Sequence, residues 1–208
     1  ITKLTKEVGF GSLSNYFLQR SRQDGADFNL LVIGPAGSGK STLLSNLYNS
    51  EILPADRRRN TRIEDTLEFV QHESEIKEAN VALRLKVTEV LGYGELSFVK
   101  TNKNNAQKIQ NILKHVDSKH KEHFDSENYA QSMKNNNNQA AYRDQLYHAA
   151  IIFIQPQRNL NIKASDIDLL KALQGRVNVI PVIAKADTYI NEELNRIKSN
   201  LKKSIHEA

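Results

Sequence analysis

The chain has 208 residues, of which 39% are hydrophobic and 25% are charged, and its formal net charge is +5. These values are typical of one soluble globular domain. No apolar run is long enough to span a bilayer, the first residues (I-T-K-L-T-K-E) form no hydrophobic signal segment, and no cysteine is present for a disulfide or a thiolate metal site. We therefore expect a cytoplasmic protein that is stabilised by packing.

A glycine-rich turn follows the first apolar run. Phe28 to Ile33 predicts a buried strand, and Gly34 to Ser41 (G-P-A-G-S-G-K-S) precedes an amphipathic segment, Thr42 to Asn49. A strand, a glycine loop and a helix in this order are typical of a phosphate-binding loop. The predicted phosphate-binding residues are Gly34, Gly37, Ser38, Gly39, Lys40, Ser41 and Thr42.

Each residue type in this loop has a chemical role. The glycines permit a positive φ and a close approach of the backbone to phosphate, while the N-terminus of the following helix adds positive potential. Lys40 would neutralise charge on the β- and γ-phosphates, and the Ser41 hydroxyl would complete the coordination of Mg²⁺. The loop therefore predicts a magnesium-nucleotide site without identifying the base.

Two strands are expected next. The polar connection Glu51 to Asp65 contains the tightest basic cluster, Arg57 to Arg59, which we interpret as a solvated loop. Leu67 to Val70 begins one strand, and a second is indicated by apolar residues that alternate with polar or small ones: Val81, Leu83, Leu85 and Val87. We expect these two strands to pair in the antiparallel direction.

A surface helix is predicted from Asn105 to Glu122, because four apolar residues recur there at helical spacing: Ile109, Ile112, Leu113 and Val116. The segment Asp125 to Tyr147, with four asparagines in a row at Asn135 to Asn138, predicts a flexible loop.

Strand and helix then alternate to the end of the chain. We expect strands at Ala149 to Ile154 and Val177 to Ala184, and a helix at Asp166 to Leu173. A final helix is indicated by apolar residues at helical spacing: Leu194, Ile197, Leu201 and Ile205. This order predicts an α/β fold with a mostly parallel sheet, helices on both faces, and ligands at the carboxyl ends of the strands.

A second candidate motif, Ala184-Lys185-Ala186-Asp187, follows the last apolar strand. The Asp187 carboxylate can accept two hydrogen bonds from N1–H and the 2-amino group of guanine, a donor pair that adenine lacks, and the Lys185 stem can cover the ring. On its own, A-K-A-D is more often a helix-capping turn. Together with the phosphate loop it predicts guanine binding by Ala184, Lys185 and Asp187.

The chain resembles the septins, a family of filament-forming guanine-nucleotide-binding proteins. The likeness lies in Val8-Gly9-Phe10 with Ser12-Leu13, G-P-A-G-S-G-K-S-T-L, Leu91-Gly92-Tyr93-Gly94, and Val177 to Thr188. It implies a lead-in segment at 1–27 and a Ras-like, three-layer P-loop domain at 28–208 that binds GTP or GDP with Mg²⁺. It also implies other septin subunits as partners in hetero-oligomeric filaments of the cytoskeleton, at a septin ring, cleavage furrow or cell cortex, acting in cytokinesis and cortical scaffolding.

Departures from the family pattern bear on the mechanism. Septins usually carry D-T-P-G-[FY]-G-D in the third nucleotide motif, where this chain has E-V-L-G-Y-G-E from Glu89. Glu89 would either displace the magnesium ion or its water, or be a solvated carboxylate at a strand end, while Gly92 still offers its N–H to a γ-phosphate. Neither Thr61 nor Thr66 is in register with the family's switch threonine. The resemblance is closest to the non-hydrolysing subgroup, which implies a structural nucleotide and no assigned catalytic residue.

Two further departures concern assembly. Septins usually show P-x-G-H-G-L-K where this chain has Q-P-Q-R-N-L-N-I-K, at Gln155 to Lys163, so the contact with the nucleotide of an adjoining subunit would be made differently or not at all. The resemblance also implies that the domain is incomplete at its C-terminus, because the chain ends at Ala208, before the family's last nucleotide-binding strand.

Other functions are weighed against these motifs. A slow GTPase that hydrolyses GTP to GDP is the main alternative, and a kinase or ATPase that shares only the phosphate loop is disfavoured by Asp187. A metal site at His120 and His123 is conceivable from their spacing, but a solvated helix face is favoured. The basic residues are scattered among 24 acidic ones, so we expect no nucleic-acid partner, while an anionic membrane surface stays open.

Overall fold

The protein is described from a computed structural model, which covers residue 14 and residues 25–48, 67–78, 81–94, 102–133 and 144–206. Within these ranges, five strands form one sheet in the order β2-β3-β1-β4-β5. The strands are β1 (Ala26–Ile33), β2 (Glu68–Glu78), β3 (Val81–Leu91), β4 (Ala149–Ile154) and β5 (Asn178–Ile183). All neighbours pair in parallel except β2 and β3, which are antiparallel. The predicted α/β class and the antiparallel pair are confirmed.

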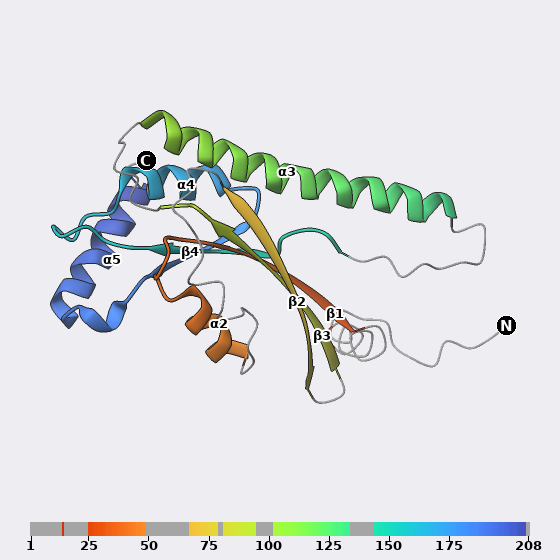
Figure 1. Ribbon diagram of the computed structural model, residues 1–208, viewed down its shortest axis with the longest axis horizontal. Coiled ribbons are helices and arrows are strands. Elements are labelled where there is room, and N and C mark those ends of the chain that lie inside the picture. Colours follow the sequence, from red (N-terminus) through yellow and green to blue (C-terminus); the bar gives the residue numbers. More distant parts are fainter. Residues whose placement is uncertain are drawn as a thin grey trace.

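Helices cover both faces of the sheet (Figure 1). On one face lie α3 (Asn102–Met133), α4 (Ala164–Leu173) and α5 (Asn191–His206), which contribute to one buried apolar cluster. On the other face, α2 (Lys40–Tyr48) buries Leu44 in a second cluster. The result is a three-layer αβα arrangement, and within the described residues no helix is both long and apolar enough to cross a membrane.

Strand β1 contributes to both clusters. Leu31 and Ile33 belong to the cluster under α3 and α4, whereas Leu30 and Val32 belong to the cluster under α2. Successive side chains of a strand point to opposite faces, so a strand between two helical layers needs apolar residues at every position. This explains why the four residues before the phosphate loop, Leu30 to Ile33, are all apolar.

The predicted end of the long helix is wrong. Helix α3 continues past Glu122 to Met133, so the first part of the segment predicted as a loop is helical. The apolar period stops earlier because α3 extends past the sheet (Figure 1), and polar pairs such as Lys119–Glu122 and His123–Glu127 line it there. The asparagine run at 135–138 lies outside the described residues, as do the basic cluster 57–59, both candidate switch threonines and, apart from residue 14, the predicted lead-in up to residue 24.

Candidate functional site

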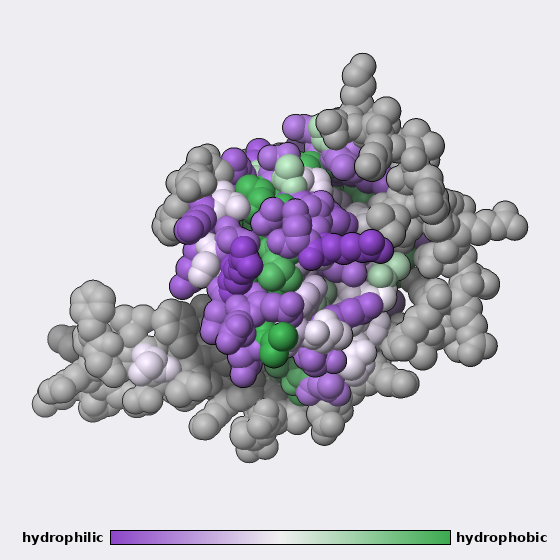
Figure 2. Space-filling view, turned by 90° about the vertical axis from the view of Figure 1, so that its left-hand side faces the viewer, coloured by the Kyte–Doolittle hydropathy of each residue, from purple (hydrophilic) through white to green (hydrophobic). Residues whose placement is uncertain are grey.

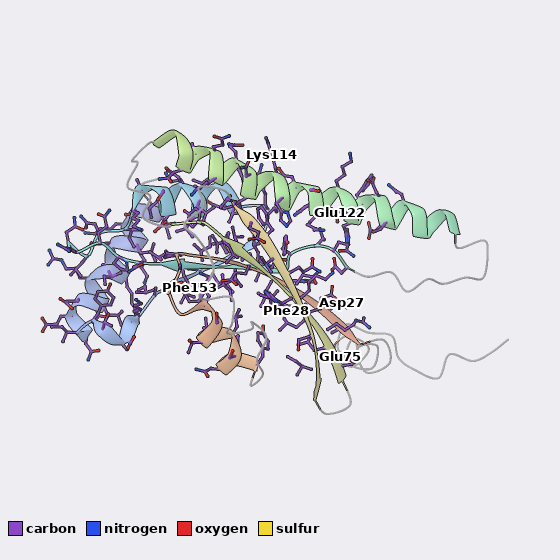
Figure 3. All side chains as sticks on the ribbon, viewed as in Figure 1. Asp27, Phe28, Glu75, Lys114, Glu122 and Phe153 are labelled. Atoms are coloured by element: carbon purple, nitrogen blue, oxygen red, sulfur yellow. The ribbon has the colours of Figure 1, made fainter. Side chains whose placement is uncertain are left out.

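The phosphate-loop sequence joins β1 to α2 at the carboxyl end of the sheet. Gly37 and Gly39 have φ angles of +70° and +95°, and a Cβ at either position would meet no atom within 4 Å. Backbone conformation, and not crowding, therefore requires glycine at these two positions. At Gly34 the reason is space, because a Cβ there would lie 2.6 Å from the Cβ of Phe153 on β4, a residue that Figure 3 places at this end of the molecule.

Lys40, the first residue of α2, is buried beside this loop, with 6% of its surface exposed. Its ammonium group donates to the carbonyl oxygens of Gly34 and Pro35, at 3.0 and 2.9 Å. The Glu89 carboxylate on β3 lies 3.5 Å from the same nitrogen. Buried charges need partners, and here the acceptors come from the loop itself and from the strand next to β1.

Two serines of the loop differ in their surroundings. Ser38 is buried, and its hydroxyl is one of the few buried side-chain atoms among the described residues without a hydrogen-bond partner. Such atoms are rare in folded proteins; the other one among the described residues is Nε2 of His120 on α3. Ser41 is half-buried and Thr42 is exposed. A buried free hydroxyl, a buried ammonium and an open glycine backbone fit an anionic phosphate, and the half-buried Ser41 hydroxyl fits its magnesium ion.

The third nucleotide motif is held against the phosphate loop. A Cβ at Gly94 would lie 3.4 Å from the Cβ of Pro35, and Gly92 has a φ angle of +82°. Lys108 on α3 donates to the Gly92 carbonyl oxygen at 2.9 Å. This motif is therefore positioned by α3 and lies beside the glycine-rich loop.

Tyr93 anchors the same motif from within the core. Its side chain is 4% exposed, and its hydroxyl donates to the carbonyl oxygen of Ser165 and to Oδ1 of Asp166, both at 3.2 Å. Burial, followed by the negative charge of Asp166, raises the pKa of Tyr93, and burial also raises the pKa of Asp166. Tyr93 thus fixes the motif to the start of α4.

Glu89 is placed more deeply than a solvated strand end would be. Its side chain is 15% exposed, and in the parallel register it lies opposite Val32 of β1, two positions before the phosphate loop. The contact with Lys40 argues against the solvated interpretation. It brings the carboxylate to the ammonium group that is predicted to bind phosphate.

The A-K-A-D motif begins where β5 ends. The Ala184 backbone donates to Ile154 of β4 at 2.8 Å, and Lys185 adopts a left-handed conformation with a φ of 53°. A short 3-10 helix, η3 (Ala186–Thr188), follows, and the Thr188 hydroxyl donates to the Lys185 carbonyl oxygen at 2.8 Å. Asp187 and Lys185 are exposed. Because β1, β4 and β5 are parallel, this turn and the phosphate loop lie at one edge of the sheet, on either side of β4.

The surface seen from the side that carries α5 is mostly hydrophilic, with small apolar patches between polar groups (Figure 2). Among the residues described, no group of three or more histidine, aspartate or glutamate side chains converges on a metal position. His123, one of the two histidines considered for such a site, lies 3.2 Å from Asp144 and 3.6 Å from Glu127.

The loop Gln155 to Lys163 follows β4 at the same edge. Leu160 has a φ angle of 62°, which is unusual for a bulky residue. The Asn200 side chain on α5 donates to the Leu160 carbonyl oxygen at 3.3 Å, while Arg158 and Asn159 are exposed.

Sequence reasoning missed three features of this site: the Lys108 bond to Gly92, the Tyr93 anchor, and the unpartnered hydroxyl of Ser38. Lys108 lies within the predicted helix, but its target is visible only once α3 packs on the sheet. The only advance signal for Tyr93 was its place between two glycines.

Comparisons with known proteins agree with this geometry. The septin family model matches residues 24–208. The septin homolog spn1 of Schizosaccharomyces pombe is 33% identical over 208 residues, covering 98% of this chain and 41% of that protein. Septin-4 of Rattus norvegicus is 31% identical over 201 residues, covering 95% of this chain and 40% of that protein. The chain therefore spans about two fifths of the length of these relatives.

A solved structure shows the same fold. The septin GTPase domain from Chlamydomonas reinhardtii superposes with a TM-score of 0.55 and 22% sequence identity, covering 86% of this chain and 60% of that chain. The overall fold of this chain is thus similar to that of a septin GTPase domain.

Proposed function

Because the chain belongs to the septin family, we propose that it is a guanine-nucleotide-binding septin subunit in which the nucleotide is mainly structural. The observation that carries this proposal is the meeting of two motifs at one edge of the sheet. A loop suited to phosphate and a turn suited to guanine lie on either side of β4. A phosphate-binding ATPase would not need the second motif.

The proposed roles follow from the contacts. The Lys40 ammonium would exchange its bonds to the loop carbonyls for bonds to the β- and γ-phosphates. The backbone N–H groups from Gly37 to Thr42 and the Ser38 hydroxyl would complete the phosphate shell, with Ser41 at the metal. Mg²⁺, when bound, would supply positive charge to the phosphates. Asp187 would accept the guanine hydrogen bonds beside Lys185 and Ala184.

We infer little or no hydrolysis. Phosphoryl transfer requires positioned groups around the γ-phosphate and a placed attacking water. In this chain Glu89 stands where the family's aspartate is expected, and it lies 3.5 Å from Lys40. The remaining contribution of this motif would be the Gly92 N–H toward a γ-phosphate.

The proposed partners are other septin subunits in a hetero-oligomeric filament, in a cytoplasmic, cytoskeletal setting at a septin ring, cleavage furrow or cell cortex, with roles in cytokinesis and cortical scaffolding. The support is family membership. The loop Gln155 to Lys163 lacks the family's histidine, so a contact across a subunit interface would use exposed residues such as Arg158 or Asn159. An anionic membrane surface is a further candidate partner.

The base assignment can be tested by calorimetric titration of the chain with Mg²⁺–GDP and Mg²⁺–ADP. We expect GDP to bind, and Asp187→Asn to weaken GDP binding by about a hundredfold while ADP binding changes little. Asp168→Asn, at an exposed aspartate of α4, is the matched control and should leave both affinities unchanged. Equal losses for the two nucleotides in the Asp187 variant would refute its assigned role.

A further inference from the structure

The ion pair between Lys40 and Glu89 has a consequence for ligand choice. The two side chains are 6% and 15% exposed, and 3.5 Å separates Nζ from Oε1. Charges that are mostly withdrawn from water interact more strongly than exposed ones, and removing one member leaves the other without its counter-charge. Glu89 is therefore a strong local partner for the ammonium group.

The same ammonium group is the one that the phosphates would bind. Lys40 in a phosphate-binding loop serves the β- and γ-phosphates, yet here the Glu89 carboxylate already lies within ion-pair distance of it. A phosphate that reaches Lys40 would bring a second anion close to this carboxylate. Two anions sharing one ammonium repel each other unless another cation is added.

We propose that Glu89 competes with the nucleotide phosphates for Lys40, and that a divalent cation relieves this competition. The site thereby selects a nucleoside diphosphate or triphosphate that arrives with its metal ion over the metal-free nucleotide. The proposal rests on the proposed function, and it assigns to Glu89 a role in specificity that does not require hydrolysis. A shorter acid at this position would reach less far toward the ammonium group.

The test compares GDP affinity with and without Mg²⁺ in the wild-type chain and in Glu89→Gln. In EDTA, the variant should bind GDP about tenfold tighter than the wild type, because the competing charge is gone. In excess Mg²⁺ this advantage should vanish or reverse. In EDTA, the GDP affinity of Glu89→Asp should lie between those of the wild type and Glu89→Gln. This variant still tests the competition if the glutamine variant folds poorly.

The matched control is Glu73→Gln on β2. Glu73 forms an ion pair of similar length with Lys86, at 3.4 Å, but its side chain is 60% exposed. It should change GDP affinity in neither condition, because exposed pairs are screened by solvent. Thermal melting of the nucleotide-free proteins adds an independent readout: Glu89→Gln should melt below Glu73→Gln, since it leaves Lys40 buried with less counter-charge.

The outcomes separate this inference from the proposed function. If the wild type binds Mg²⁺–GDP and neither Glu89 variant gains affinity in EDTA, the inference is overturned while the proposed function stands. If the wild type binds no GDP in either condition, both are overturned. A gain in EDTA that disappears with Mg²⁺ supports the competition.

Discussion

The two ends of strand β1 hold their polar groups in different ways. At the carboxyl end, the buried Ser38 hydroxyl has no partner, and Lys40 is held by its own loop and by Glu89. At the amino end, the Asn29 side chain donates to the carbonyl oxygens of Asp144 and Leu146 at 2.9 and 2.8 Å. Figure 3 shows the two ends, with Phe153 at the first and Asp27 and Phe28 at the second.

The amino end is a network centred on Asp144. One carboxylate oxygen accepts the Leu146 N–H at 2.8 Å and lies 3.2 Å from His123 on α3. The other lies 3.2 Å from Nε2 of His148, while Nδ1 of His148 accepts the Asn29 N–H at 3.0 Å. These contacts join α3, β1 and the segment before β4, and the polar groups are hydrogen-bond or ion-pair partners of one another.

This difference in hydrogen bonding is the one expected between a ligand-binding site and a region that only holds secondary-structure elements together. A polar group reserved for a ligand is incompletely satisfied by the protein, whereas groups that hold elements together satisfy one another. Substitutions at the carboxyl end should therefore change nucleotide affinity most, and substitutions at the amino end should change stability most.

The largest effect is expected for Lys40→Ala. Losing a charged donor to phosphate should cost about 3 kcal/mol or more, which is roughly a hundredfold or greater loss of GDP affinity. The rise in melting temperature on adding Mg²⁺–GDP should disappear, because that rise depends on ligand binding to the folded state. Lys86→Ala, at a half-buried lysine of β3, should retain it. An unchanged rise in Lys40→Ala would contradict the assignment.

At the opposite end, Asn29→Ala should lower the free energy of unfolding by about 2 to 3 kcal/mol, since it removes two donated bonds from a buried side chain. GDP affinity should change less than about threefold. Urea denaturation measures the first and calorimetry the second. Asn178→Ala removes one bond from an exposed amide and should cost less; a large loss of GDP affinity in Asn29→Ala would break the comparison.

Tyr93→Phe tests whether a residue within a predicted nucleotide motif can serve stability alone, because Tyr93 lies in that motif but its hydroxyl contacts α4. Removing its hydroxyl should cost about 1 to 1.5 kcal/mol of stability, since the Asp166 carboxyl and the Ser165 carbonyl lose a donor. We expect a small change in GDP affinity. A hundredfold loss would show instead that Tyr93 acts at the ligand.

The smallest effect concerns pH. Burial, with a contribution from Lys119 and against the opposing charge of Glu122, lowers the pKa of His115 in the folded protein. In the unfolded chain the pKa of the His115 side chain is about 6.5, so near and below that pH the unfolded state binds more protons than the folded state. Stability present above that pH is lost as the pH falls toward the lowered folded value. We expect a change under about 1 kcal/mol after solvent screening.

His115→Gln should flatten this part of the stability profile. The side chain stacks on Phe69 and is hydrogen-bonded to Tyr147 at 2.9 Å, so some stability is lost at every pH. The diagnostic quantity is the slope of unfolding free energy against pH between about 7 and 5. An identical slope in the wild type and the variant would show that another group is responsible.

Most of the fold could be predicted from the sequence because its signals are local. The strand Ala149–Ile154 is a continuous apolar run and has the predicted bounds. The end of α3 could not be found in this way, since apolar periodicity reports only the turns that pack, and the last turns project past the sheet. Its exposed Phe124, at 62%, shows that apolar residues there do not mark a core.

The candidate site likewise has features that local motifs predict and features that depend on contacts between distant segments. The glycine loop and the A-K-A-D turn are contiguous motifs, and strand order predicts that they share an edge of the sheet. The contacts of Glu89 with Lys40 and of Lys108 with Gly92 join residues that are far apart in the chain. Their partners follow from strand register and helix packing, which no single segment encodes.

The central claim is that this chain holds a guanine nucleotide at the phosphate loop. The most direct test is to denature freshly purified protein, identify the released nucleotide by ion-pair chromatography and quantify it against protein concentration. We predict a near-stoichiometric guanine nucleotide, with GTP exceeding GDP because little is hydrolysed. Mostly GDP would contradict the structural role and favour a slow GTPase, and folded protein that releases no guanine nucleotide would contradict the central claim.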